Sequence, residues 1–580
     1  MVFNPADHVN VPKISFAQWN KRKPVFQWLT PKIDGKKFIK LSQDESQQLS
    51  REPITHTISC GDGVVELVLS IDIFSNQPKP KQALLFFSFR DKDGRILDPV
   101  VDYPFSKALN KSYVYLNTDP RQFDQVLLIL PETCRSVDIG LQTWDSGDAK
   151  IQLSNKVGIT TYKEGVSVVI PTYKGVNTIR KCIESLLNQD FPKDSYELLI
   201  AINGESDGTN ILLEKIKRKH PLANIRILQI QEAGVANARN LAVSESSYNY
   251  TTFIDDDDYV SQSYLTSLYS LADYYSVVLT GVTDVSPEGK TLPTVITQQL
   301  GKVLLKEDIQ YSDVSSSLTM NACKLAPAHM VKAVSYLCEL RSGEDVVYWS
   351  ELISRFQPRV KVVEELENAV YYRVLRENSV SRQKESFDFN VRQRLMVISE
   401  LIRLLKNAPV KIIADFVQSK INAQAGFVKR YLSKYPQEFP DFQLLVDELK
   451  VNNSVIREIN AQFSTALIIS YCYAPYIDTS GVVMGKRVRN MEQTVDVIYN
   501  SMDKVRSKDA NLLNISLPFV GKMIELKCAQ TFSNWNGIEQ FAEQAFVETA
   551  RLLSRRPIYE KIYSRAMWPA SHFAAALIKI

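Results

Sequence analysis

The sequence predicts a multidomain protein whose central α/β domain carries a parallel, Rossmann-like sheet. Two observations predict this architecture. First, 580 residues are too many for one hydrophobic core, since domains average roughly 100–200 residues. Second, from Gly165 onward short apolar runs alternate with helix-like stretches, a pattern typical of parallel sheets. An N-terminal β-sandwich, a helical connector and a partial C-terminal α/β segment complete the predicted fold.

Changes in sequence pattern set the expected boundaries. We expect an N-terminal arm at 1–58, a β-sandwich module at 59–158, the α/β domain at 165–385, a helical connector at 386–463 and a partial α/β segment at 464–580. The arm carries the aromatic residues Phe16, Trp19, Phe26 and Trp28, which could pack on another domain.

The β-sandwich module is predicted from alternation. Every second residue from Val65 to Ile73 is apolar, which places these side chains on one face of a strand. Residues 83–97 are expected to form two strands around a turn that contains Asp93 and Gly94. Further strands are expected at 112–116, 125–130 and 137–144. The module has either a structural or docking role, or a sugar-binding role that uses exposed aromatic residues such as Trp144.

The central domain should contain buried strands at 166–170, 196–202, 225–229 and 251–254, with helices at 177–189 and 210–219. Continuous apolar runs predict strands that are covered on both faces. In open α/β sheets, ligands bind beyond the carboxyl ends of the strands. Candidate site residues are therefore sought directly after each strand.

Bulk composition excludes several classes of protein. The net charge of +4 gives no support for nucleic-acid binding, which needs concentrated basic surface. The seven cysteines are odd in number and scattered without CxxC spacing, which argues against a disulfide framework and a zinc site. The first residues contain no apolar signal core, and no apolar run approaches the roughly 20 residues that span a bilayer. We therefore expect a cytoplasmic protein; association with the inner face of the membrane stays open.

The strongest chemical signal is the run of four aspartates at 255–258, directly after an apolar strand. Adjacent carboxylates repel one another, so a cation should compensate them. Mg²⁺ and Mn²⁺ take carboxylate oxygens and bridge to diphosphates. A solvated acidic turn is the alternative, and the position of the run at a strand end argues against it.

Five segments resemble motifs of the family-2 glycosyltransferases of the GT-A fold. They are SVVIPTY at 167–173, GVANARN at 234–240, FIDDDD at 253–258, SGEDV at 342–346 and YYRVLRENSVS at 371–381. The resemblance covers 165–385, with the motifs in the family's order. It implies a GT-A fold and a donor that is a nucleotide-diphosphate sugar, with a UDP-sugar preferred.

The resemblance also implies a role for each matching residue. Pro171, Thr172 and Tyr173 lie where the nucleotide is cradled, Asn203 lies where the family usually has an aspartate, and Arg239 braces the acidic loop or the nucleotide. Asp255 and Asp256 lie on the donor side, and Asp255 and Asp257 are the expected metal ligands. Asp345 is the candidate general base, with Glu344 as the second choice. The alternative for Glu344 and Asp345 is an acidic pair that is stabilised by a helix N-terminus.

The leading hypothesis is an inverting, metal-dependent glycosyltransferase that uses Mg²⁺ or Mn²⁺ and acts on a glycan or glycolipid acceptor of the bacterial surface. Inversion follows from the resemblance alone. One alternative is a non-catalytic scaffold or glycan-binding protein with a degenerate transferase fold, which Asn203 favours. Another is a nucleotidyltransferase, but the loop after the first strand, PTYKG, lacks the usual basic, glycine-rich phosphate loop. Homo-oligomerisation stays open.

The C-terminal segment carries a second resemblance. Residues 470–488 are similar to the first strand and glycine loop of a GT-B glycosyltransferase, and a Rossmann-like strand, loop and helix is the alternative. We expect strands at 466–470 and 494–499, a weaker one at 512–515, and helices at 538–553 and 558–567. No room remains for a second, donor-binding half, so this segment should bind no nucleotide by itself.

Overall fold

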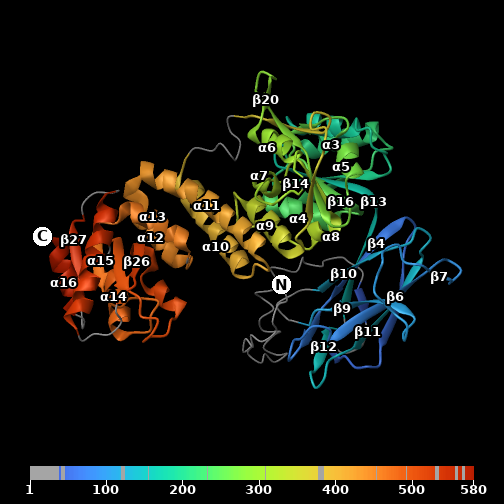
Figure 1. The fold of residues 1–580 in the computed structure, drawn as a ribbon. Helices are drawn as coiled ribbons and strands as arrows, with labels where there is room; N and C mark the ends of the chain where they lie inside the picture. The colour runs from blue at the N-terminus through green and yellow to red at the C-terminus, as the bar shows by residue number, and fades with distance from the viewer. Residues whose placement is uncertain are drawn as a thin grey trace. The chain divides into compact units, whose positions relative to one another are not determined.

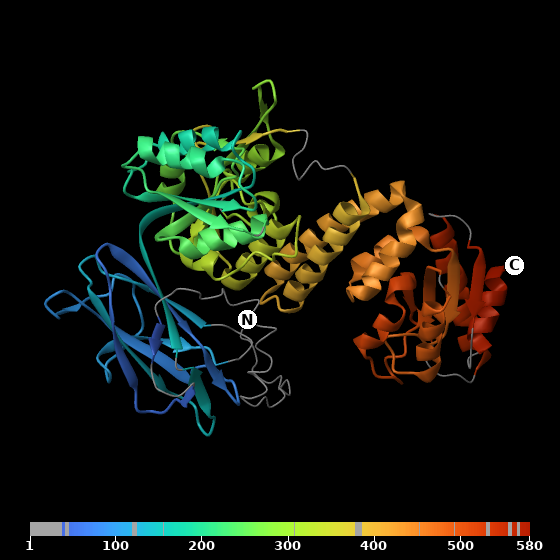
Figure 2. The ribbon, with the colours of Figure 1, turned by 180° about the vertical axis from the view of Figure 1, so that it is seen from behind.

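The computed structural model describes residues 38–580 except 41–45, 119–123, 155, 232, 307, 377–384, 452, 492, 529–533, 555–558, 565–568 and 580. The chain divides into two compact units (Figures 1 and 2). The first comprises residues 1–338 and 351–376, and the second comprises 339–350 and 377–580. Most of the predicted arm, including its four aromatic residues, lies outside the described residues.

The N-terminal part of the first unit is built from β-strands. They are β1 (Phe38–Lys40), β2 (Ser46–Gln48), β3 (Ile54–Ser59), β4 (Val64–Ile71), β5 (Ile73–Ser75), β6 (Ala83–Arg90), β7 (Ile96–Leu97), β8 (Phe105–Ser106), β9 (Lys111–Leu116), β10 (Asp124–Ile129), β11 (Ser136–Thr143) and β12 (Ile151–Ser154). One sheet runs in the order β3-β11-β6-β9-β8, and a smaller one in the order β2-β12-β5. Alternate residues of β4, β6 and β11 share a single apolar core, as the alternating pattern predicts. Strand β3 begins before the expected boundary at residue 59.

Strand β13 (Lys156–Thr172) joins this β-rich part to the α/β part without a linker. Its first half pairs antiparallel with β4, and its second half pairs parallel with β14 (Tyr196–Asn203) and β16 (Tyr248–Phe253). The register shifts between Lys163 and Val166, and Gly165 in between has φ +137°. A Cβ atom at Gly165 would lie 2.0 Å from the carbonyl oxygen of Ser195, so this position requires glycine. Two regions that the sequence separates therefore share one sheet.

The α/β part follows the predicted alternation of strands and helices. Besides β13, β14 and β16, its elements are α2 (Ile179–Leu187), α3 (Thr209–Lys219), β15 (Ile225–Ile230), α4 (Val235–Glu245), β17 (Tyr259–Val260), α5 (Tyr264–Ser270), β18 (Ser276–Leu279), β19 (Gly281–Val285), β20 (Thr291–Pro293), α6 (Val295–Val303), α7 (Ser315–Thr319), β21 (Lys324–Pro327), α8 (Ala328–Lys332), α9 (Glu344–Phe356), β22 (Arg359–Val362) and β23 (Val370–Val374). Strands β15, β14, β13 and β16 lie side by side in parallel, and β21, β18 and β22 extend the sheet beyond β16. Every residue of β14 and β16 is buried, as expected for strands covered on both faces.

The second unit contains the helical connector and a parallel sheet. The connector helices are α10 (Gln393–Lys406), α11 (Lys411–Lys434), α12 (Phe439–Glu448) and α13 (Ser454–Asn460). The sheet runs in the order β26 (Val520–Leu526), β25 (Val495–Asn500), β24 (Ala466–Ser470) and β27 (Lys561–Ser564), all parallel. Its helices are α14 (Thr479–Arg489), α15 (Trp535–Leu553) and α16 (Pro569–Lys579), and α13 packs on the edge strand β26.

Two predictions for the C-terminal segment are wrong. The expected strand at 512–515 is part of a 3-10 helix, Ala510–Ile515, because the side chain of Asp509 accepts a hydrogen bond from the Asn511 backbone N–H and starts a helical turn. Within the expected helix at 558–567, residues 561–564 form β27, which pairs with β24. Tertiary pairing here overrides the local pattern.

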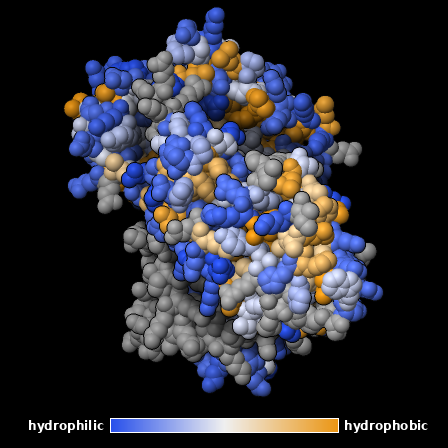
Figure 3. Space-filling model, turned by 90° about the vertical axis from the view of Figure 1, so that its left-hand side faces the viewer, coloured by the Kyte–Doolittle hydropathy of each residue, from blue (hydrophilic) through white to orange (hydrophobic). Residues whose placement is uncertain are grey.

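Several large apolar side chains of α15 and α16 are exposed, among them Trp535, Phe546 and Phe573. Figure 3, which faces the left-hand side of Figure 1, shows apolar side chains in patches among polar ones. Within the described part of the chain, no helix combines the length and apolar character that crossing a membrane requires.

Candidate functional site

The candidate site lies at the carboxyl ends of β13, β14 and β16. Because these strands are parallel neighbours, their last residues meet at one edge of the sheet. Thr172 ends β13, Asn203 ends β14, and the aspartate run at 255–258 follows β16. Arg239 on α4 reaches the same edge. The structure thus brings together most of the residues that the sequence predicts for the donor side.

Asp255 and Asp257 each face one arginine. Arg239 Nη2 lies 3.0 Å from Asp255 Oδ1, and Arg376 Nη2 lies 3.3 Å from Asp257 Oδ2. Arg239 is buried, and its guanidinium lies 5.5 Å from the centre of the Tyr336 ring. The side chains of Asp255 and Asp257 remain 44% and 28% exposed. Both carboxylates can therefore accept a further cation from solvent.

Asp258 is buried and Asp256 is half-buried, and each accepts a hydrogen bond from a neighbouring hydroxyl. Thr172 Oγ1 donates to Asp256 Oδ2 at 2.5 Å, and Tyr371 Oη donates to Asp258 Oδ2 at 2.8 Å. Burial raises the pKa of Asp256 to about 6; the charge of Asp255 adds to the rise, while the bond from Thr172 opposes it. Burial, with the charge of Asp255, also raises the pKa of Asp258. These inner carboxyls fix the loop, while Asp255 and Asp257 present charge to solvent.

Asn203 ties two loops of the site together. Its Nδ2 donates to the carbonyl of Thr172 at 2.8 Å, and its Oδ1 accepts from the backbone N–H of Gly234 at 2.9 Å. The side chain is buried and both ends of its amide are engaged. Asn203 therefore supports the backbone between the first strand and the start of α4.

The other predicted residues of the donor side differ in exposure. Pro171 is buried within β13, whereas the Tyr173 ring is 52% exposed and borders the same loops. The ring passes close to Gly204, where a Cβ atom would lie 2.9 Å from Tyr173 Cε2. Of these two residues, Tyr173 is the one whose ring is available for stacking on a ligand.

Tyr371 and Arg376 are site residues to which the sequence analysis assigned no role. Strand β23 pairs with β17, the short strand directly after the aspartate run, with Tyr371 opposite Val260. The Tyr371 hydroxyl accepts a hydrogen bond from the Asp255 backbone N–H at 3.1 Å and donates to Asp258. The segment 371–381 was singled out as a motif, and its arginines were the signal that could have pointed to Arg376; residues 377–381 lie outside the described residues.

Glu344 and Asp345 form the first turn of α9 and belong to the second unit. Burial lowers the pKa of Lys420 to about 8, and the negative charge of Asp345 opposes this fall. The charges of Asp345 and Glu344 likewise oppose the effect of burial on the pKa of Arg394. Asp345 therefore has buried cations of both α10 and α11 as electrostatic neighbours, and Glu344 has Arg394 of α10. This arrangement fits a counter-ion role as well as the predicted catalytic one.

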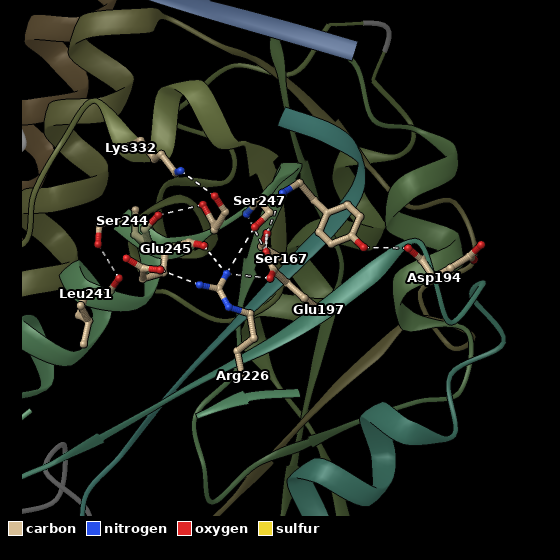
Figure 4. Close-up of polar contacts among 12 residues, drawn as sticks. Ser167, Asp194, Glu197, Arg226, Leu241, Ser244, Glu245, Ser247 and Lys332 are labelled. Carbon is tan, nitrogen blue, oxygen red and sulfur yellow. Dashed lines mark hydrogen bonds and ion pairs between the residues drawn. The ribbon is translucent and has the colours of Figure 1, made fainter. Parts of the chain in front are cut away.

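The amino end of the same sheet carries a different carboxylate arrangement, shown in Figure 4. Glu197 at the start of β14 is buried and accepts hydrogen bonds from Ser167 Oγ at 2.8 Å and the Ser247 backbone N–H at 2.7 Å. Arg226 lies 3.1 Å from Glu197 and 2.6 Å from Glu245. This network joins four elements, and the charge of the buried Glu197 is compensated within it. We therefore interpret the network as structural.

The acidic loop is the candidate position for a metal ion. Among the described residues, no group of three or more His, Cys, Asp or Glu side chains is arranged to hold a metal ion. Asp255 and Asp257 can supply two carboxylates, and a diphosphate would add the oxygen ligands that Mg²⁺ and Mn²⁺ prefer. The residues present thus fit a cation that is shared with a substrate.

The chain matches known proteins over this region. Residues 167–324 match the family model described as Glycosyl transferase family 2. The chain is 25% identical over 283 residues to the poly(ribitol-phosphate) beta-N-acetylglucosaminyltransferase TarS of Staphylococcus aureus, covering 47% of each protein. It is 25% identical over 188 residues to a poly(ribitol-phosphate) beta-glucosyltransferase of Bacillus spizizenii, covering 32% of this chain and 28% of that protein. It is also 37% identical over 106 residues to the minor teichoic acid biosynthesis protein GgaA of Bacillus subtilis, covering 18% and 24%.

The chain spans less than half the length of each of these relatives. Among solved structures, residues 1–349 of S. aureus TarS in complex with UDP-GlcNAc align with a TM-score of 0.39 at 21% identity, covering 51% of this chain and 84% of that one. The match to the family model coincides with the strands, helices and acidic loop that build the candidate site. Residues 167–324 therefore form a domain of glycosyltransferase family 2.

Proposed function

We propose that the protein is an inverting, metal-dependent glycosyltransferase that takes its sugar from a nucleotide-diphosphate donor, with a UDP-sugar preferred. One observation carries the proposal. Two partly exposed carboxylates, Asp255 and Asp257, stand at the carboxyl end of a buried parallel strand inside the family-2 domain. A ligand site at this edge is the rule for open α/β sheets.

Each residue of the acidic loop has a distinct part in this proposal. Asp255 and Asp257 would hold Mg²⁺ or Mn²⁺, which would stabilise the charge that develops on the leaving diphosphate. Asp256 and Asp258 hold the loop through Thr172 and Tyr371. Tyr173 would stack on the nucleotide base, and its half-exposed ring supports this role.

Arg239 and Arg376 are the cations of the site. Each lies beside one of the partly exposed carboxylates. Each could therefore form an ion pair with the diphosphate when the diphosphate and a cation bind together. Arg376 is 38% exposed and can move, whereas Arg239 is almost fully buried. We assign Arg376 to the diphosphate and Arg239 to support of Asp255.

Asp345 remains the proposed general base, which would accept the proton of an acceptor hydroxyl. A competing role follows from its neighbours. Its charge acts on the buried Lys420 and Arg394, so it can instead serve as their counter-ion. The two roles predict different responses to a neutral substitution of Asp345. Loss of a general base lowers turnover, because the base acts in the transition state, whereas loss of a counter-ion lowers stability.

The acceptor class comes from the relatives. Two of them are named as transferases acting on poly(ribitol-phosphate), and a third as a teichoic acid biosynthesis protein. We propose a glycan of the bacterial surface as acceptor.

The test is a panel of nucleotide sugars assayed for hydrolysis and transfer with Mg²⁺, with Mn²⁺ and with EDTA. We expect one UDP-sugar to be consumed in the presence of a divalent cation and none in EDTA. Full activity in EDTA would contradict the metal site. Failure of every nucleotide sugar to bind or react would favour a non-catalytic scaffold.

A further inference from the structure

The second unit contains a cavity that the proposed transferase does not use. It has a volume of about 530 Å³ and lies beside the edge strand β26, near the carboxyl ends of β25 and β26. Pockets for small ligands typically measure about 300–1,000 Å³, so this one can hold one or two sugar-sized units. The residues that decide its chemistry are Arg457, Glu458, Tyr499, Lys508, Lys522 and Glu525.

Two of the three cations of the cavity have no carboxylate partner within the described chain. Lys508 Nζ lies 2.7 Å from Asp503 and 3.8 Å from Glu525, so its charge is compensated. The lining carboxylate of Glu458 is compensated in turn by Lys429, at 2.9 Å.

Arg457 and Lys522 remain. Arg457 lies on α13 and contacts the thioether of Met523, and Lys522 is exposed on β26. No ion pair joins either of them to a carboxylate among residues that the structure describes. The cavity therefore carries an excess of positive charge that is suited to an anion, and phosphate groups are the common biological anions that arginine and lysine hold together.

Other hydrogen-bonding groups also line the cavity beside Arg457 and Lys522. Tyr499 is buried, and burial raises the pKa of its hydroxyl. The charge of Glu525 adds to this rise, while the charges of Lys508 and Arg457 oppose it. Glu525 accepts a hydrogen bond from the Tyr476 hydroxyl at 2.5 Å, and its carboxylate is exposed. A carboxylate and a tyrosine beside two cations suit a ligand that bears hydroxyl groups as well as negative charge.

A nucleotide is a poor candidate for this unit. Nucleotide phosphates commonly bind at the N-terminus of the helix that follows the first strand of such a sheet, which is α14 here. Asp478 occupies that position, since its Oδ1 accepts hydrogen bonds from the backbone N–H groups of Ser480 and Gly481. Its Oδ2 is paired with Arg506 at 3.1 Å. An anionic cap at this point repels a phosphate, which agrees with the expectation that the segment binds no nucleotide by itself.

We propose that this cavity binds a phosphate-bearing sugar or polyol, with Arg457 and Lys522 on the phosphate and Tyr499 and Glu525 on the hydroxyl groups. The proposal goes beyond the transferase function, since every residue it uses belongs to the second unit. A second site of this kind would let the chain hold a phosphate-containing glycan at a point other than the donor site.

Calorimetric titration of the full chain tests the proposal with three probes: ribitol 5-phosphate, ribitol and inorganic phosphate. We expect ribitol 5-phosphate to bind more tightly than either of the other two. Because a hydrogen bond to a charged group is worth about 1.5–3 kcal/mol, the double variant R457Q/K522Q should bind it at least roughly tenfold more weakly. The control K486Q changes an exposed lysine of α14 that does not line the cavity, and should bind as the wild type does.

The single variant K522Q guards against misfolding, because its side chain is exposed, and it should weaken binding in the same direction. Equal binding by the wild type and R457Q/K522Q, or no binding of ribitol 5-phosphate, would overturn the proposal. Equal affinity for inorganic phosphate would reduce the cavity to an unspecific anion site and would overturn it too. UDP titration of the same variants separates the two functions, since the cavity variants should leave UDP binding unchanged.

Discussion

The two ends of the central sheet differ in how far the charges of their carboxylates are compensated. At the amino end, Glu197 is buried but receives hydrogen bonds from two neighbours and an ion pair from Arg226 (Figure 4). At the carboxyl end, Asp255 pairs with Arg239 and Asp257 with Arg376, and burial raises the pKa values of Asp256 and Asp258. The same strands therefore carry a satisfied network at one end and an under-compensated one at the other.

This difference distinguishes carboxylates that stabilise the fold from carboxylates that can bind a ligand. A compensated buried carboxylate stabilises the strands that it joins and has little left to offer a ligand. Like charges that are held together without full compensation cost stability, and they mark functional sites for that reason. The contrast therefore supports the proposal that the functional site lies at the carboxyl end of the sheet.

The largest expected effect comes from neutralising the exposed pair. The variant D255N/D257N should lower transfer roughly 10³-fold or more, because metal ligands supply several kcal/mol of charge stabilisation in the transition state. Loss of the partly exposed pair between Asp257 and Arg376 should change stability by less than about 1 kcal/mol. Loss of the Asp255 charge should cost more, because Arg239 is buried and keeps no ion pair with Asp255. Steady-state transfer rates and urea denaturation measure the two effects. Loss of the fold together with activity would remove the contrast between the sheet ends.

The next effect concerns Asp345. If it is the general base, D345N should lower turnover by about 10²–10⁴-fold while UDP binding persists, since only the proton acceptor is lost. E344Q is the matched control on the same helical turn and should retain most of the turnover. A fall in thermal stability with normal turnover per folded molecule would show that Asp345 is instead the counter-ion of Lys420 and Arg394.

At the amino end of the sheet, we expect a substitution to lower stability and to leave transfer unchanged. R226M leaves Glu197 buried without its cation, and should cost on the order of 2–3 kcal/mol of unfolding free energy. This is the low end for a broken buried pair, because Arg226 is 33% exposed and two hydrogen bonds to Glu197 remain. Transfer per folded molecule should stay at the wild-type level. A large loss of turnover in folded R226M would show that the two ends are coupled.

The smallest expected effect is a pH dependence from a third carboxylate, Glu66 on β4. Burial raises its pKa to about 8, and the hydrogen bond from Asn249 opposes the rise. Because the folded pKa lies above the unfolded one, the unfolded chain loses this proton at lower pH, and stability falls as pH rises toward 8. Between pH 6 and 7.5 the expected loss is about 2 kcal/mol. In E66Q this part of the pH dependence should disappear; an unchanged slope would mean that Glu66 is ionised in the folded chain.

The sequence predicts the catalytic part of this fold well, for a definite reason. Buried parallel strands have continuous apolar sequences, so the carboxyl ends of the strands at Thr172, Asn203 and Phe253 are predicted within a few residues. The aspartate run could be placed at a strand end from the same pattern. The family resemblance implies that Arg239 lies beside the acidic loop or the nucleotide, and Arg239 pairs with Asp255. The contacts of Tyr371 and Arg376 with the loop could not be predicted, because tertiary contacts between distant segments bring these residues there.

Prediction failed where pairing depends on distant partners. The strand predicted at 166–170 is only the second half of β13, which begins at Lys156 and pairs with β4 through its first half. Strand β27 reads as part of a helix, because its four residues form a strand only in contact with β24. Short segments of this kind carry too little local signal to outweigh tertiary context.

Calorimetric titration of UDP, with and without Mn²⁺, tests the central claim most directly. It should be carried out on the wild type, on D255N/D257N and on R226M at a temperature where all three are folded. We predict Mn²⁺-dependent binding by the wild type and R226M, and loss of the Mn²⁺-dependent part in D255N/D257N. Binding of UDP that is equally tight without metal, or that survives unchanged in D255N/D257N, would contradict the assignment of Asp255 and Asp257 as the metal-binding carboxylates of the site.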